Sequence, residues 1–257
     1  MDRTPQMDTE NMDSARQSAP ASAETGRRAN YEGTPRWKRG LDVLVASACL
    51  GWAVPLGLMV AGWIRLTSPG PIFFRQQRIG LSGQVFWIWK FRTMHVEADS
   101  GLHRRYVKQL AQEAGELRKL DASYRLIPGG RLLRALALDE LPQLGNVLVG
   151  EMSLVGPRPD VLEWDDYEPW QRERFAVLPG ITGLWQVSGK NRTTFREMIE
   201  LDLEYIRRRS LALDLWILVQ TVPAVARQWL DDRTGCSVSR PAARRAEETA
   251  DAEGMAT

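Results

Sequence analysis

Two adjacent carboxylates, Asp139 and Glu140, stand in the leucine-rich segment LDELPQL at residues 138–144. A carboxylate can act as a nucleophile toward phosphorus, and a neighbouring carboxylate can help to bind a hard metal ion such as magnesium. The plainer interpretation is a helix start, because acidic side chains complement the positive end of the helix dipole and Pro142 suits an early helical position. Taken alone, the pair leaves both interpretations open.

The segment GPRPD at residues 156–160 holds an arginine between two prolines. Pro157 and Pro159 each fix a φ angle, and the residue before a proline is pushed toward an extended conformation. We therefore expect a stiff loop that presents the guanidinium of Arg158, whose planar fork suits a phosphate group. An isolated GPRP segment would equally fit an ordinary turn with a solvated arginine.

Basic residues are concentrated in the first third of the chain. Between Arg36 and Arg92 there are eight basic residues and one acid, Asp42, although the whole chain has a formal charge of only +2. Such a block indicates an anionic partner, whether lipid headgroup, phosphate or nucleic acid. Two further segments, KFRT at 90–93 and PGITGLWQVSGKNR at 179–192, contain basic side chains in addition to the carboxylate pair and GPRPD. The second segment predicts a glycine turn, an aromatic strand and a basic loop. The candidate phosphate contacts in these segments are Lys90, Arg92, Lys190 and Arg192.

Residues 40–64 form an apolar run with a single charge near one end, bounded by Arg65. A continuous helix of this length, at about 1.5 Å per residue, could cross a hydrocarbon core roughly 30 Å thick, whereas it is long for a buried core helix. Pro55 near its middle predicts a kink. Basic residues flank both ends, which favours both ends on the same side of the membrane over a single span.

The rest of the chain predicts an α+β fold that is mostly helical. Ile72 to Arg75 and Val85 to Phe91 predict a small β-hairpin. Apolar helix is expected from Gly130 to about Leu148, with an interruption near Asp139 and Pro142. Helices are also expected over 102–120, 194–209 and 214–230. The two cysteines lie far apart and imply no disulfide framework, and the two histidines lack metal-ligand spacing, so a zinc site is not expected.

Five segments in consistent order resemble the bacterial sugar transferase family, the monotopic phosphoglycosyl transferases that start glycan assembly on polyprenyl phosphate. They are KRGLDVL, SPGPIFFRQQRIG, FWIWKFRTM, LDELPQLGNVLVGEMSLVGPRPD and PGITGLWQVSGKNR, and the resemblance as a whole runs from about Lys38 to Leu230. With one apolar segment the chain is similar to the short members, which have a single re-entrant membrane helix. The resemblance therefore implies a bend at Pro55.

The resemblance also implies an activity. Sugar 1-phosphate would pass from a nucleoside diphosphate sugar, usually a uridine one, to polyprenyl (undecaprenyl) phosphate, with Mg²⁺ required. Asp139 would be the nucleophile that carries the phosphosugar, Glu140 its acidic partner, and these two carboxylates the metal ligands. Arg134 and Arg158 would contact phosphate or nucleotide. The chain departs from the family pattern at Val54, where Ser is common, and at Glu151, where Asp is common.

We thus expect four parts: a disordered tail at 1–35, a re-entrant membrane helix at 36–66, a cytoplasmic catalytic domain at 67–230 and a disordered tail at 231–257. The expected location is the cytoplasmic face of a bacterial inner membrane, with no nucleic acid as partner. Two alternatives are a non-catalytic membrane-anchored scaffold of glycan assembly and a hydrolase of the same diphosphates. Two adjacent carboxylates argue against the scaffold, since binding an anion does not need them.

Overall fold

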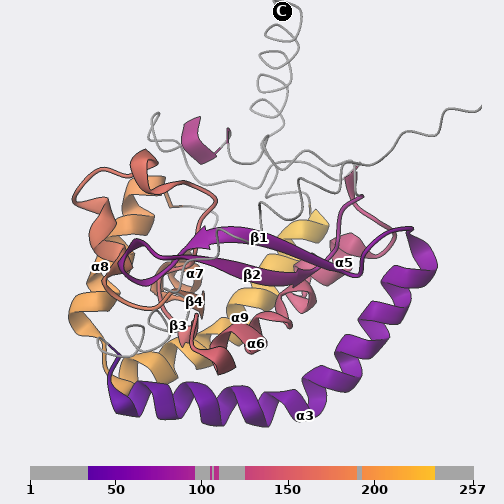
Figure 1. Ribbon diagram of the computed structural model, residues 1–257, viewed down its shortest axis with the longest axis horizontal. Helices are drawn as coiled ribbons and strands as arrows, with labels where there is room; N and C mark the ends of the chain where they lie inside the picture. Colours follow the sequence, from indigo (N-terminus) through magenta and orange to yellow (C-terminus); the bar gives the residue numbers. More distant parts are fainter. Residues whose placement is uncertain (1–33, 96–104, 106, 110–124, 190–192, 235–257) are drawn as a thin grey trace, which may run out of the picture.

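The computed structural model describes residues 34–95, 105, 107–109, 125–189 and 193–234 (Figure 1). In this part of the chain helices predominate, and the strands form two small sheets. The predicted fold class, α+β and mostly helical with a small hairpin, is therefore confirmed. The helix predicted over 102–120 and the two predicted tails lie largely outside the described residues.

The apolar segment forms one long helix, α3 (Arg36–Thr67). In Figure 1 it runs along the base of the molecule and then turns upward along one side. Pro55 lies inside it, where a proline removes a backbone donor and crowds the preceding turn. The re-entrant course of this helix in a membrane stays a prediction.

Many exposed side chains of α3 are apolar, whereas its buried face includes charged residues near the start of the helix. Lys38, Asp42 and Ala46 are buried at a spacing of four residues, which places them on one face of the helix. By contrast, Leu44 is 70% exposed and Leu66 is 87% exposed. Among the described helices, α3 is the one long and apolar enough to cross a membrane. This distribution supports association of α3 with a membrane.

Strands β1 (Phe73–Ile79) and β2 (Val85–Phe91) form the predicted antiparallel hairpin, and β1 is longer than expected. The 3-10 turn η1 (Leu81–Gly83) lies between them. In the register, Phe74 lies opposite Lys90 and Arg78 lies opposite Phe86. Because side chains alternate between the faces of a sheet, Arg78 and Lys90 share one face of the hairpin.

A second sheet brings together the two glycine-containing segments of the sequence. Strand β3 (Ser153–Val155) pairs in parallel with β4 (Gly180–Thr182). The backbones approach so closely that a Cβ atom on Gly180 would lie 2.1 Å from the backbone nitrogen of Gly156. Glycine at these positions therefore places the GPRPD loop directly against PGITG.

The remaining described elements are helices and 3-10 turns, of which α8 and α9 are the longest. They are α5 (Gly130–Ala135), η3 (Leu138–Glu140), α6 (Gln143–Val149), η4 (Trp164–Asp166), η5 (Gln171–Ala176), α7 (Leu184–Gly189), α8 (Phe195–Arg208) and α9 (Leu211–Thr234). The predicted helices at 194–209 and 214–230 correspond to α8 and α9, and α9 continues to Thr234.

The prediction of an aromatic strand within 179–192 is wrong for the residues that follow β4. Residues Leu184–Gly189 form helix α7, which buries Leu184 and Trp185 and contacts α8 and α9. Periodicity does not separate a short apolar run in a buried strand from one in a buried helix. Packing against α8 and α9 favours the helical conformation of this segment.

A buried polar network fixes the start of α3 to the rest of the protein. Lys38 Nζ lies 2.6 Å from Asp214 Oδ2 of α9, and both side chains are fully buried. The hydroxyl of Tyr205 donates to Asp214 Oδ1 at 2.8 Å. Asp42 Oδ1 accepts a hydrogen bond of 3.0 Å from the Ser153 hydroxyl of β3. Helix α3 is thus joined to α9 and to the sheet that positions the GPRPD loop.

Candidate active site

Asp139 and Glu140 lie in the 3-10 turn η3, not in a regular helix as one possible interpretation of the sequence held. Ala137 precedes this turn with φ of 54°, in the left-handed region that non-glycine residues seldom adopt. Such backbone strain persists where the surrounding structure fixes it, and it is frequent at functional sites. Pro142 then caps α6, so the carboxylates occupy a tight turn between α5 and α6.

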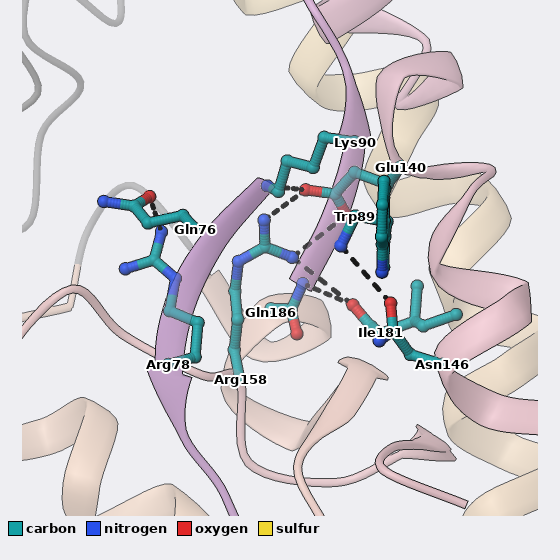
Figure 2. Close-up of polar contacts among 9 residues, drawn as sticks. All are labelled: Gln76, Arg78, Trp89, Lys90, Glu140, Asn146, Arg158, Ile181 and Gln186. Carbon is teal, nitrogen blue, oxygen red and sulfur yellow. Dashed lines mark hydrogen bonds and ion pairs between the residues drawn. The ribbon is translucent and has the colours of Figure 1, made fainter. Parts of the chain in front are cut away.

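Glu140 is held by two cations (Figure 2). Lys90 Nζ of β2 lies 3.0 Å from Glu140 Oε1. Arg158 donates through Nη1 to Glu140 Oε2 at 3.1 Å and through Nη2 to Glu140 Oε1, in a bidentate pair. Planar pairing of this kind fixes orientation as well as distance. The carboxylate of Glu140 is therefore positioned by the hairpin on one side and by the GPRPD loop on the other.

Asp139 stands in a different environment. Its side chain is buried, at 8% exposure, and within the described residues its carboxylate accepts no hydrogen bond. Burial raises its pKa above the ordinary aspartate value, while the charge of Lys90 opposes this shift. The charges of Arg134 and Arg158 also oppose it, and that of Glu140 adds to it. A carboxylate that has cations nearby and accepts no hydrogen bond from the described residues is available to bind or attack an electrophile.

The loop that carries Arg158 is fixed from behind by a buried arginine. Arg174, at 1% exposure, donates through Nη2 to the carbonyl oxygen of Arg158 at 2.9 Å. The same guanidinium pairs with Asp160 and, at 2.6 Å, with Asp202 of α8. Burial lowers the pKa of Arg158, but the charge and hydrogen bond of Glu140, together with the charges of Asp139 and Asp160, outweigh burial, and the net shift is upward. Arg158 therefore stays charged and aimed at Glu140.

The structure gathers some of the predicted site residues and separates others. Lys90, Arg158 and Arg134 all lie near the carboxylates, the last close enough for its charge to affect Asp139. Arg92 does not join them, because its guanidinium donates to the backbone oxygens of Ser68, at 2.9 Å, and Pro69, where it ties the end of α3 to the hairpin. Lys190 and Arg192 lie outside the described residues.

Three further residues near the site were missed by the sequence analysis. Arg78 lies on the hairpin face that carries Lys90, and Arg174 supports the GPRPD loop. Asn146 of α6 donates to the carbonyl oxygen of Trp87 at 2.8 Å and accepts from the backbone of Trp89, so it fixes β2 beside the carboxylates. Strand alternation could have indicated Arg78, whereas the other two depend on contacts between distant segments.

A pocket of about 320 Å³ lies beside the carboxylate turn. Its lining residues are Trp89, Pro142, Gly145, Asn146, Val149 and Glu151. Glu151 Oε2 accepts a hydrogen bond of 2.7 Å from the Asn146 side chain. The glutamate that departs from the family pattern thus supports the asparagine that holds β2.

Comparison with known proteins finds a family and relatives whose sequences are similar to this chain. A family model described as bacterial sugar transferase matches residues 34–228. The exopolysaccharide production protein ExoY of Sinorhizobium fredii is 41% identical over 191 residues, which cover 73% of this chain and 84% of that protein. A UDP-glucose:undecaprenyl-phosphate glucose-1-phosphate transferase of Caulobacter vibrioides is 42% identical over 197 residues, which cover 73% of this chain and 69% of that protein.

Proposed function

The chain belongs to the bacterial sugar transferase family, and from that premise we propose that it is a phosphoglycosyl transferase that moves sugar 1-phosphate from a uridine diphosphate sugar to undecaprenyl phosphate in exopolysaccharide assembly. The reaction would take place at the cytoplasmic face of the inner membrane, with α3 as a re-entrant anchor bent at Pro55. The observation that carries the proposal is the contrast between two adjacent carboxylates: Glu140 is held by Lys90 and Arg158, while Asp139 is buried with its oxygens free of hydrogen bonds in the described chain.

This contrast divides two roles. In the first step an oxygen of Asp139 attacks the sugar-linked phosphorus of the donor, the bond to the bridging diphosphate oxygen breaks, and the nucleoside monophosphate leaves with that electron pair. In the second step a phosphate oxygen of undecaprenyl phosphate attacks the same phosphorus and releases the Asp139 carboxylate. Arg158 and Lys90 supply positive charge beside the reacting phosphate and hold the Glu140 carboxylate in a fixed position.

The residues of the site fit a magnesium ion that is completed by the substrate. Mg²⁺ prefers oxygen ligands and is usually held by one or two carboxylates together with substrate phosphates and waters. Asp139 and Glu140 are the carboxylates that would hold it, and the free oxygens of Asp139 suit such a role. When bound, the ion would neutralise charge on the diphosphate.

The covalent step is tested by trapping the intermediate. The full-length protein in detergent is incubated with uridine diphosphate glucose and magnesium but without acceptor, then digested for mass spectrometry. We expect a hexose phosphate adduct on the peptide that contains Asp139, and no adduct in Asp139→Asn. Full turnover by Asp139→Asn would exclude the proposed nucleophile. Glu140→Gln should be severely impaired, because Arg158 and Lys90 would then lack their charged partner.

Turnover with and without acceptor separates the proposal from its alternatives. A transferase releases stoichiometric nucleoside monophosphate without undecaprenyl phosphate and many equivalents with it. A hydrolase turns over without acceptor, and a scaffold releases nothing from any donor in a panel of uridine diphosphate sugars. The scaffold is disfavoured by family membership and by the intact carboxylate pair.

A further inference from the structure

Arg78 of β1 lies on the site side of the hairpin. Its register opposite Phe86 places it on the face that carries Lys90, whose side chain reaches Glu140. Nη2 of Arg78 donates to Gln76 Oε1 at 2.7 Å, and this bond fixes the guanidinium plane (Figure 2). The hairpin therefore presents two cations, at its two ends, to the same side.

Two donor atoms of this guanidinium are unused. Nε and Nη1 of Arg78 are buried, and neither has a hydrogen-bond partner among the residues that the structure describes. Buried polar groups are almost always paired in native proteins, because leaving a charged donor without a partner is costly. A buried pair of unused donors beside a reaction site indicates a ligand that supplies the missing acceptors.

The nearby carboxylates do not supply the acceptors that Nε and Nη1 of Arg78 lack. Glu140 is already paired with Lys90 and Arg158, and Asp160 is paired with Arg174. The charges of Asp160, Arg158 and Glu140 all act on Arg78, so it lies within electrostatic reach of the site. Burial lowers its pKa to about 10, which leaves it charged at neutral pH.

The net charge of the side chains around the carboxylate turn favours binding of an anion. Lys90 and Arg158 contact Glu140, and Arg78 lies on the same face of the hairpin as Lys90, so these three cations outnumber the carboxylates of Asp139 and Glu140 even when both are ionised. The donor's diphosphate carries negative charge on each phosphate. An anion of this kind would satisfy both the excess charge and the unused donors.

The position of Arg78 selects one of the two phosphates. Lys90 and Arg158 contact Glu140 directly, whereas Arg78 bonds to Gln76 and lies opposite Phe86, four residues along β2 from Lys90. Arg78 therefore lies farther from Glu140, the neighbour of the nucleophile, than Arg158 does. In-line displacement places the leaving group on the side opposite the nucleophile.

We propose that Arg78 binds the leaving phosphate of the donor, the one that departs with the nucleoside, through Nε and Nη1. This inference rests on the proposed function, since it assigns a residue to one part of that reaction. As the bridging P–O bond breaks, negative charge grows on the leaving phosphate, and a planar two-donor fork stabilises that charge.

Direct binding tests the assignment without turnover. Full-length protein in detergent, with magnesium, is titrated with inorganic pyrophosphate, uridine monophosphate and uridine. The variants are Arg78→Gln, Arg78→Lys and the control Arg75→Gln. Arg75 lies on the same strand but on the opposite face, where its guanidinium stacks 5.0 Å from the centroid of the Trp87 ring. Thermal unfolding of each variant monitors the fold.

We expect Arg78→Gln to weaken binding of pyrophosphate and uridine monophosphate by roughly ten- to a hundredfold, the range for one lost charged hydrogen-bonding group. Uridine, which has no phosphate, should bind as to the wild type. Arg78→Lys should fall between the two because it keeps the charge without the fork. Arg75→Gln should bind all three probes normally.

Three outcomes would overturn the assignment. The first is pyrophosphate binding that is equal in the wild type and in folded Arg78→Gln, or in folded Arg78→Lys should the glutamine variant not fold. The second is an equal loss of uridine and uridine monophosphate, which would make Arg78 a structural residue. The third is a wild type that does not bind pyrophosphate. Failure of the proposed function looks different, because the wild type would then release no nucleoside monophosphate from any donor.

Discussion

Arg174 carries one positive charge but is enclosed by two carboxylates. Its guanidinium pairs with Asp202, which is 1% exposed, and with Asp160, which is less buried. Burial raises the pKa of Asp202 to about 7, and the charge of Asp160 adds to this shift while Arg174 opposes it. One cation cannot fully compensate two buried anions, so the more buried carboxylate takes up a proton first.

This arrangement predicts that stability falls as pH rises toward neutrality. In the folded state Asp202 holds its proton up to about pH 7, whereas in the unfolded chain it releases it near the ordinary value of 3.8. The stabilising contribution is therefore complete below the unfolded value and is lost as pH rises through about 7. Thermal unfolding of the full-length protein in detergent, followed by tryptophan fluorescence between about pH 5 and 8, should show a falling midpoint.

Asp202→Asn supplies the control for that experiment, because an amide cannot ionise. The variant should show a flatter dependence on pH, with other titrating groups unchanged. A slope equal to that of the wild type, or a wild type that gains stability over this range, would refute the assignment to Asp202.

Single residues with an unusual sequence context could be predicted, while residues that act through distant contacts could not. The adjacent carboxylates and the arginine between prolines stand out in the sequence, and the structure brings Asp139, Glu140 and Arg158 together. Arg92 has the same residue type and a similar context to Lys90, yet it bonds to backbone oxygens. Residue type predicts that a side chain can bind phosphate, but only the fold decides where its donors point.

Among the helices and strands, strong periodicity was sufficient to predict the type of element, whereas a short apolar run did not show whether it forms a helix or a strand. The hairpin and α8 have patterns that match their periods, and α8 also begins with a capping box between Thr194 and Glu197. Helix α7 was predicted as a strand because its few apolar residues fit either period. The parallel pairing of β3 with β4 joins segments far apart in the sequence, which local patterns do not reveal.

The pairing of β3 with β4 predicts a sharp difference between two glycines. Gly180→Ala would place a Cβ atom 2.1 Å from the backbone nitrogen of Gly156, and no side-chain rearrangement relieves a contact with backbone. We expect a loss of about 3 kcal/mol or more of stability, from strain of the overpacking kind. Because the GPRPD loop begins at this contact, any variant protein that folds should also lose activity.

Gly145→Ala is the matched control, since a Cβ atom there meets nothing within 4 Å. Gly145 lies in helix α6, where alanine is favoured over glycine by about 1 kcal/mol, so its unfolding midpoint should be unchanged or higher. The thermal unfolding midpoints of Gly180→Ala and Gly145→Ala, measured in the same detergent, test this difference. Equal stability of the two variants would show that the β3 and β4 backbones do not approach as described.

At the scale of the whole molecule, α3 is fixed at its start and apolar along its length. The buried pair of Lys38 and Asp214 holds the first turns to α9, whereas the residues around Leu58 and Met59 are largely exposed. Basic residues flank both ends of the helix, and carrying Arg36 and Lys38 across a bilayer would oppose the usual orientation bias. We therefore predict that both ends of α3 stay on the cytoplasmic side.

Accessibility labelling in intact cells tests this topology. Cys49 and Cys236 are replaced by serine, a single cysteine is placed at Ser22 or Ser237, and an impermeant thiol reagent is added. Both positions should be protected. Labelling at position 22 alone would demonstrate a spanning helix. Pro55→Ala should increase labelling at position 22 if the proline causes the bend, and unchanged protection would assign the cause to the flanking charges.

The contact of Asn146 with β2 also bears on self-association. A two-stranded hairpin leaves an outer edge of unpaired backbone groups, onto which a strand of another molecule could add. The Asn146 amide donates to the carbonyl of Trp87 and accepts from the N–H of Trp89, as a peptide unit of a third strand would. Because this rung is occupied from within the molecule, a strand of another molecule cannot pair with β2 at Trp87 and Trp89, and strand addition would have to use the outer edge of β1.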